Sequence, residues 1–74
     1  MKTQEIMQAL YDSEINFKIF SFWDGGFHVF IGDEMNGFKE ESCCENVNSI
    51  AICLTTMAVK HFPGSTFVIR LNRG

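Results

Sequence analysis

Two hydrophobic periodicities follow one another at the start of this chain. Residues 3 to 13 place three apolar side chains on one stripe of a helix, with Thr3 as its cap and Glu5 in its first turn, where the helix dipole favours an acid. From residue 17 the period changes to two, and aromatic and β-branched residues predict a strand over residues 17–23. The chain is therefore predicted to begin with a helix that leads into a strand.

Two turn signals divide the next residues into a meander. Asp24-Gly25-Gly26 ends the first strand, and Asn36-Gly37 supplies residues that tolerate positive φ for a second reversal. We therefore expect a second strand from residue 27 to about residue 32 and a third over residues 38–44. The charged side chains of the third strand are typical of a sheet edge.

The first turn also predicts a register. If Gly25 and Gly26 are the two central residues of a tight hairpin, Trp23 pairs with His28 and Phe20 pairs with Ile31. One face of the sheet then carries Phe20, Phe22, Val29 and Ile31, and the other carries Ile19, Trp23, His28 and Phe30. Helices of this chain can cover one of these apolar faces, so the second is predicted to be available for a partner.

A second helix is predicted from the N-cap Asn46 to about His61, although Ser42 and Glu45 also fit a capping box that would start it earlier. Pro63-Gly64 ends this helix, and the alternation of residues 66–71 predicts a last short strand. The back of the helix has no charge, which is unusual for a solvated face and makes it another candidate binding surface, with Ile52, Thr56 and Val59.

The expected fold is a single α+β domain over residues 1–74. Its elements follow the order α-β-β-β-α-β in a two-layer sandwich, with a mainly antiparallel meander sheet and two helices on one face. A chain this short buries little surface, so association with a second copy is one common way for it to gain stability.

The charge is unevenly distributed. The formal net charge of −3 argues against a general nucleic-acid binder, which needs a basic footprint. Residues 24–45 hold six acids and one lysine, whereas residues 46–74 hold three bases and no acid. We interpret the acids either as a solvated hairpin tip or as an acidic patch that steers a basic partner, formed by Asp33, Glu34, Glu40 and Glu41.

Catalytic and metal-binding signals are weak. The three cysteines, Cys43, Cys44 and Cys53, are an odd number with no metal-ligand spacing, so we expect no metal, no cofactor and no disulfide framework. Cys43 lies diagonally near His28 in the predicted register, and a Cys-His nucleophile pair is one hypothesis. Buried, inert cysteines are the alternative.

Two motifs carry a resemblance. The stretch Phe22-Trp23-Asp24-Gly25-Gly26-Phe27, followed by a G-D-x-M-N-G-F segment over residues 32–38, resembles a family of small uncharacterised bacterial and phage proteins. The likeness covers about residues 15–65 and includes the later segment His61-Phe62-Pro63. The resemblance implies a phage or mobile-element accessory protein that binds a host machine, in the manner of an anti-CRISPR inhibitor, and implies no activity.

These observations favour a non-enzymatic protein-binding module that binds a second copy of itself as a homodimer, or a host protein. One alternative is a nucleic-acid module, because α-β-β-β-α is also the order of double-stranded RNA-binding domains. The other is a small thiol enzyme that uses Cys43 and His28. The N-terminus has no apolar leader and no segment is long enough to span a membrane, so we expect a cytoplasmic protein without membrane contact.

Overall fold

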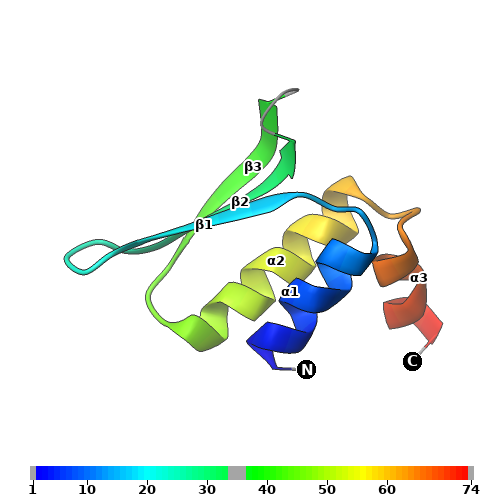
Figure 1. Ribbon diagram of the computed structural model, residues 1–74, viewed down its shortest axis with the longest axis horizontal. Helices are drawn as coiled ribbons and strands as arrows, with labels where there is room; N and C mark the ends of the chain where they lie inside the picture. The colour runs from blue at the N-terminus through cyan, green and yellow to red at the C-terminus, as the bar shows by residue number, and fades with distance from the viewer. Residues whose placement is uncertain (1, 34–36, 74) are drawn as a thin grey trace.

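The computed structural model describes residues 2–33 and 37–73, which form an α+β fold (Figure 1). Its elements are α1 (Thr3–Asp12), β1 (Phe17–Phe22), β2 (Gly26–Asp33), β3 (Gly37–Cys44), α2 (Val47–His61) and α3 (Thr66–Arg73). The predicted helix, three-strand meander and second helix are confirmed. The predicted last strand is wrong, because residues 66–73 are helical.

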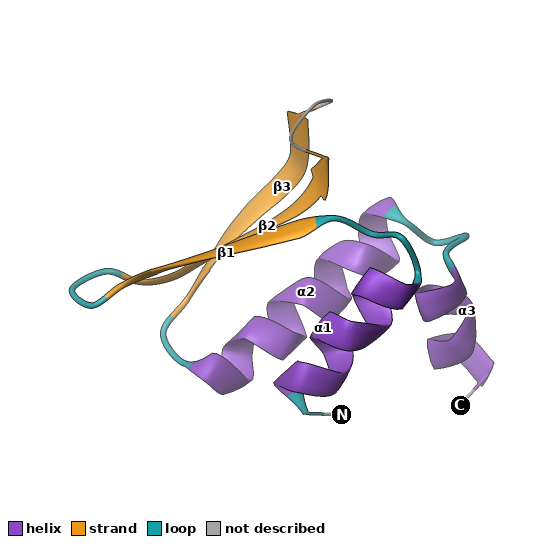
Figure 2. Ribbon diagram, in the orientation of Figure 1, coloured by secondary structure: helices purple, strands orange, loops and turns teal. Residues whose placement is uncertain are grey.

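The three strands form one antiparallel sheet in the order β1-β2-β3, and helices lie on one side of it (Figure 2). α2 packs against β2 and β3, and α1 packs beside α2. We call the side of the sheet that faces the helices the inner face. The core between them is apolar and comprises Ile6, Leu10, Ile15, Val29, Ile31, Cys44, Ile50, Leu54, Met57, Ala58, Phe67 and Val68.

The beginnings of the two long helices are joined by a hydrogen bond. Asn46 caps α2 as predicted, since its side-chain oxygen accepts the backbone N–H of Ser49 at 3.0 Å. The earlier start from Ser42 is wrong, because Ser42 lies within β3. Thr3 is not the cap of α1 but its first residue, and its hydroxyl donates to the backbone carbonyl of Val47 at 3.0 Å. This bond ties α1 to α2 at one end of the helical layer.

The predicted register of the first hairpin is wrong by three residues. Phe20 pairs with His28 and Ile19 pairs with Val29, whereas the sequence favoured Phe20 opposite Ile31. Because side chains alternate between faces, an odd shift moves every side chain of one strand to the other face relative to its partner. Ile19 therefore lies on the inner face with Val29, and Phe20 lies on the opposite face with His28.

The turn residues explain this register. A two-residue type I′ turn requires positive φ at both central residues, and of Gly25 and Gly26 only Gly26 has it, at +79°. The chain instead turns over residues 23–25, and Phe22 pairs with Gly26. A Cβ atom at Gly26 would lie 2.6 Å from the carbonyl oxygen of Cys44, so the close approach of β3 also requires glycine here.

The C-terminal residues form α3 because the buried side chains follow a helical spacing. Phe67 and Val68 are buried and Leu71 is partly buried, whereas Ile69 is exposed. Strand alternation would have placed Phe67 and Ile69 on the same face. Ser65 caps the start of α3, because its hydroxyl accepts the backbone N–H of Val68 at 3.3 Å.

An irregularity in β2–β3 pairing sets the position of one further aromatic residue. The register shifts between Ile31 and Gly32. Gly32 therefore lies opposite Phe38, a position that the following residue of β2 would occupy in a regular ladder. Gly32 has φ of +123°, and a Cβ atom there would lie 2.8 Å from the backbone nitrogen of Lys39. The bulge therefore leaves Phe38 on the same side of the sheet as Phe30.

Candidate interaction surface

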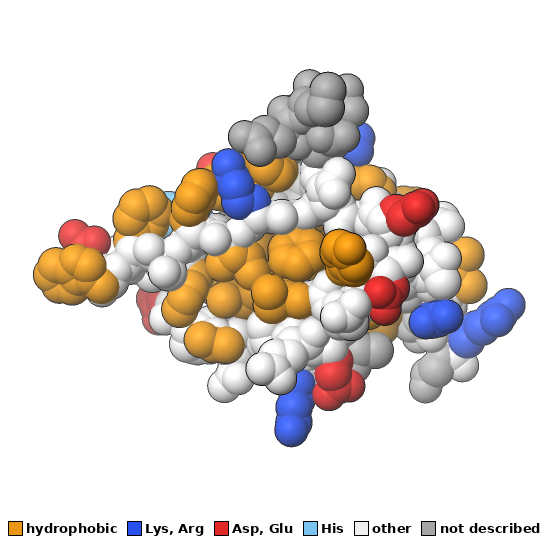
Figure 3. Space-filling view, viewed as in Figure 1, with side chains coloured by type: hydrophobic (Ala, Val, Ile, Leu, Met, Phe, Trp, Pro, Cys, Tyr) orange, Lys and Arg blue, Asp and Glu red, His pale blue; other side chains and the backbone are white. Residues whose placement is uncertain are grey.

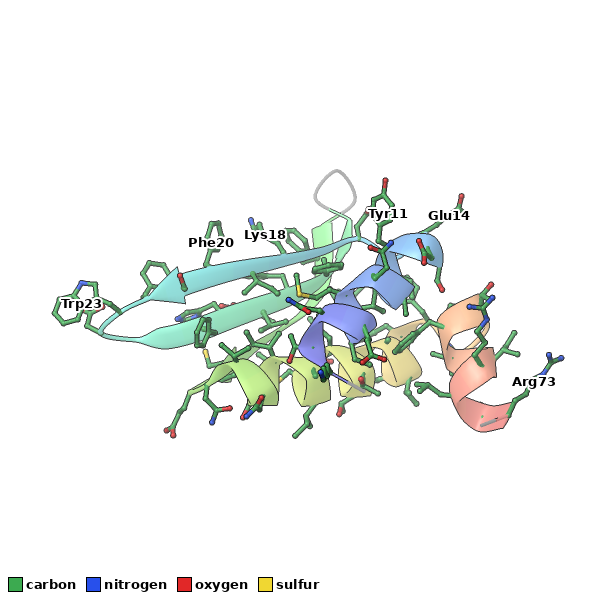
Figure 4. All side chains as sticks on the ribbon, turned by 60° about the horizontal axis from the view of Figure 1, so that its bottom comes forward. Tyr11, Glu14, Lys18, Phe20, Trp23 and Arg73 are labelled. Carbon is green, nitrogen blue, oxygen red and sulfur yellow. The ribbon has the colours of Figure 1, made fainter. Side chains whose placement is uncertain are left out.

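The side of the sheet opposite the helices carries aromatic and charged side chains, and we call it the outer face. Its members, by strand register, are Lys18, Phe20, Phe22, His28, Phe30, Phe38, Glu41 and Cys43. Figure 4 shows Lys18 and Phe20 pointing away from the helical layer. In residues 2–33 and 37–73, no helix or strand packs on this surface.

The aromatic rings of the outer face contact one another and remain accessible. Phe20 and Phe22 are 46% and 50% exposed, respectively, which is high for phenylalanine. Phe20 meets Phe30 edge to face with ring centroids 6.1 Å apart, and Phe30 meets Phe38 at 5.2 Å. A contiguous exposed apolar patch of this kind marks an interaction surface, whereas single exposed apolar residues are ordinary. Figure 3 shows further apolar side chains along the hairpin and at its tip.

Lys18 lies at the centre of three of these rings. Its Nζ atom is 4.7 Å from the ring centroid of Phe20, 5.1 Å from that of Phe30 and 4.8 Å from that of Phe38. The ammonium therefore interacts with three ring faces at once, and its alkyl stem covers apolar surface. The outer face thus has a fixed positive charge on β1.

A second polar group spans β2 and β3 and centres on His28 of β2. Its Nδ1 atom is 3.2 Å from Glu41 Oε2 and 3.4 Å from Cys43 Sγ. The structure thus brings together the predicted Cys43 and His28. In a catalytic triad, the histidine base contacts the nucleophile with one ring nitrogen and the orienting acid with the other. Here one nitrogen faces both partners, so this arrangement is that of a hydrogen-bonded surface cluster and lacks the geometry of a catalytic triad.

A shallow hollow of about 450 Å³ lies beside this cluster. Aromatic side chains and two acidic residues contribute to its lining, which consists of Phe20, Phe22, Asp24, Gly25, His28, Phe30 and Glu41. Cys43 is absent from this lining, so a molecule in the hollow would not rest on its thiol. The hollow suits an apolar or cationic side chain of a protein partner.

The four residues predicted to share one sheet face are separated. His28 and Phe30 are on the outer face, but Ile19 is on the inner face and contributes to the core. Trp23 is 98% exposed and lies at the tip of the β1–β2 hairpin, beyond the helices (Figure 4). Trp23 therefore lies at the border of the outer face and not at its centre.

The uncharged back of α2 forms a second exposed apolar surface. Ile52 is 68% exposed and Val59 is 46% exposed, and Thr56 is exposed between them. A hollow of about 320 Å³ adjoins Ile52 and Thr56 and is also lined by Ile6 of α1 and Leu71 of α3. This surface has apolar side chains without the aromatic rings or paired charges of the outer face.

The predicted acidic patch does not form one surface in the described residues. Glu40 lies on the inner side of β3, where its carboxylate contacts His61 Nε2 at 2.7 Å and Lys60 Nζ at 3.1 Å. These hydrogen bonds, first that of His61 and then that of Lys60, lower the pKa of Glu40 below its ordinary 4.5. Glu41 faces the opposite way and contacts His28. Asp33 ends β2, and Glu34 lies outside the described residues.

The sequence reading missed Lys18, Phe20, Phe22 and Phe38 as members of this surface. Lys18 was the available signal, because it is the one charged residue of β1 and shares its alternation phase with Phe20 and Phe22. Because a lysine on a strand marks the solvent-exposed face, the alternation from Lys18 would have placed both phenylalanines on the open side of the sheet.

Comparison with known proteins supplies no assignment for this surface. The chain matches no family model, no curated protein and no solved structure. Within residues 2–33 and 37–73, no group of three or more His, Cys, Asp or Glu side chains is arranged to hold a metal ion. In the same residues, every helix is too short or too polar to cross a membrane.

Proposed function

We propose that this chain is a non-enzymatic protein-binding module that associates with a second copy of itself through the outer face. The observation that carries the proposal is the contiguous set of accessible aromatic rings on the outer face. Phe20 and Phe22 are about half exposed on a sheet whose other face is sealed by helices. Exposed aromatic rings with a polar surround have the composition of a protein interface.

The charges of the outer face support a second copy as the occupant. Lys18 pairs with Phe30 on β2, and Phe30 pairs with Glu41 on β3, so the three form one row across the sheet. Two sheets related by a two-fold axis parallel to the strands would place each Lys18 opposite the Glu41 of the other copy. The same axis would bring the two Phe30 rings together. The surface is thus complementary to itself, as a two-fold symmetric interface requires.

The resulting dimer would have two sheets in the middle and the helical layers outside. Sheets pack face to face with about 10 Å between them, which aromatic side chains fill. The rings at the centre would carry most of the binding free energy, and truncating one would raise the dissociation constant by about 30-fold or more.

Sedimentation velocity over a series of protein concentrations tests this proposal. The variants are Phe20→Lys on the outer face and Val59→Lys on the back of α2, which are matched because both native side chains are 46% exposed. We expect the wild-type chain and Val59→Lys to dimerise and Phe20→Lys to stay monomeric. Circular dichroism of each variant would establish that the fold is retained.

Two results would overturn the assignment. A wild-type chain that stays monomeric at the highest concentration would exclude the homodimer and leave a host protein as the partner. Loss of the dimer in Val59→Lys but not in Phe20→Lys would move the interface to the back of α2.

Double-stranded RNA binding receives less support from the described charges, although the order α1-β1-β2-β3-α2 is the order of that domain class. The β1–β2 tip carries Asp24, and the start of α2 has no base, since Asn46 is its cap and Val47 and Asn48 are its first residues. Phosphate contacts need lysine or arginine at such positions. We therefore prefer a protein partner.

A further inference from the structure

Two of the three cysteines lie together between the sheet and α2. Cys44 is at the end of β3 and Cys53 is in α2, and their Sγ atoms are 2.7 Å apart. Both are free thiols; Cys44 is buried and Cys53 is partly buried. The two sulfur atoms already approach the separation of a disulfide, whose S–S bond is about 2.05 Å long.

The third cysteine is kept away from this pair by the strand. Cys43 precedes Cys44 in β3, so its side chain projects to the outer face, where it contacts His28. Cys43 therefore cannot reach Cys53 without breaking the β2–β3 pairing. The fold selects one pair out of the three that the sequence allows.

We propose that Cys44 and Cys53 are a reversible disulfide site, which a small-molecule disulfide oxidises to a covalent link between β3 and α2. The proposal is independent of the outer face and of any dimer. The odd number of cysteines in the composition alone would argue against such a covalent link.

The exchange proceeds in two balanced steps. The Cys53 thiolate attacks one sulfur of the oxidant, forms a mixed disulfide and releases the other half of the oxidant as a thiolate. The Cys44 sulfur then attacks Cys53 Sγ, forms the Cys44–Cys53 bond and releases the second half. The two cysteines lose two electrons and two protons, and the oxidant gains both as two free thiols.

The surroundings assign Cys53 as the first nucleophile. Cys53 is the more accessible of the two thiols, and the hydroxyl of Ser42 donates to its Sγ atom at 3.6 Å. The thiol of Cys44 instead faces the backbone carbonyl of Ser49 at 3.6 Å, an acceptor that favours the protonated thiol. Burial, together with the neighbouring Cys53, raises the pKa of Cys44 to about 12. Cys44 therefore enters in the second step.

The test uses a Cys43→Ser chain, which retains only the proposed pair. We expect oxidised glutathione to lower its intact mass by two hydrogen atoms, to abolish thiol labelling and to raise its melting temperature by ~10 °C, as expected for closing a short loop in a small domain. Dithiothreitol should reverse all three changes. The variants Cys44→Ser and Cys53→Ser, each in the Cys43→Ser chain, should show neither the loss of two hydrogen atoms nor the higher melting temperature, because their one remaining thiol can form only a mixed disulfide with glutathione.

In the wild-type chain, a protease that cleaves after glutamate places Cys44 and Cys53 on different peptides, because it cuts after Glu41 and Glu45. The expected product links the peptide of residues 42–45 to the peptide that carries Cys53. The proposal is overturned if Cys43→Ser keeps two free thiols after oxidation. It is also overturned if each thiol takes up one glutathione, or if the bond forms only in urea.

Discussion

The inner and outer faces of the same sheet differ in what covers them, although both are rich in apolar side chains. The inner face places Val29 and Ile31, which are fully buried, against helices. The outer face places Phe20 and Phe22, which are about half exposed, towards solvent. Apolar content alone therefore does not define the core of a small α+β domain, because the register decides which side chains the helices can reach.

The faces also differ in how they hold polar groups. The outer face has Lys18 over three rings and Glu41 beside His28. On the inner side, Glu40 lies at the edge and contacts Lys60 and His61 of α2. The inner charges thus join β3 to its helix, whereas the charges of the outer face point to a surface that meets something else.

Loss of an inner-face contact should destabilise the chain most. Leu54 of α2 is fully buried, so Leu54→Ala should lower the free energy of unfolding by about 3 kcal/mol through lost burial and the resulting cavity. Val59→Ala on the exposed side of the same helix should change it by less than about 0.5 kcal/mol. Urea unfolding followed by circular dichroism measures both, and equal losses would contradict the assignment of the core.

The second effect tests the register that separates the two faces. Gly26→Ala should lower the free energy of unfolding by about 2 kcal/mol, because alanine at φ of +79° is strained and its Cβ meets the carbonyl oxygen of Cys44.

The matched control for that variant is Gly25→Ala. Its added Cβ would make an ordinary 3.6 Å contact with Phe22, and we expect a change of less than about 0.5 kcal/mol by the same urea unfolding. If Gly25→Ala were the more harmful of the two, the turn would be the tight two-residue one and the faces would be reversed.

The third effect concerns the cation on the outer face. Lys18→Met keeps the stem but removes the ammonium from three rings, and should lower the free energy of unfolding by about 1 kcal/mol. Lys39→Met is the control, since Lys39 faces a single ring, that of Phe62, at 6.0 Å. Thermal unfolding at low protein concentration compares them, and indistinguishable variants would show that the three-ring contact adds no stability.

The smallest effect is the pH dependence of the edge ion pairs. The folded-state pKa of Glu40 is lowered, so its contribution to stability is present above 4.5 and is lost as the pH falls through the lowered value. Near neutral pH the wild-type chain should melt slightly above Glu40→Gln, and the two should converge well below pH 4.5. Melting curves across this range test the sign, and a gap that widens in acid would contradict it.

Local signals predicted most of the elements. The alternation of residues 17–44 and the cap at Asn46 indicated the meander and α2, because both depend on neighbouring residues. The helix α3 could not be recognised in the same way. In its short run Thr66–Leu71 the side chains also fit the alternation of a strand. Only the packing of both Phe67 and Val68 in the core favours the helix over the strand.

The candidate surface was less predictable than the fold. An aromatic surplus in the hairpin indicated an uncovered face, but the membership of that face depends on the turn. The sequence does not distinguish Gly25 from Gly26, because both are glycine. Only the approach of Cys44 to Gly26 in the folded chain distinguishes them. His28 and Phe30 were correctly placed together on one face, and Ile19 was not.

In the proposed dimer, two copies associate through the outer face with Lys18 of each copy opposite Glu41 of the other. Sedimentation velocity of Lys18→Glu, of Glu41→Lys and of their equimolar mixture tests this arrangement. Each variant alone would place like charges together twice, and the mixture would restore both opposite-charge pairs. We predict monomers for each variant alone and a dimer for the mixture. A mixture that stays monomeric while the wild-type chain dimerises would contradict this arrangement.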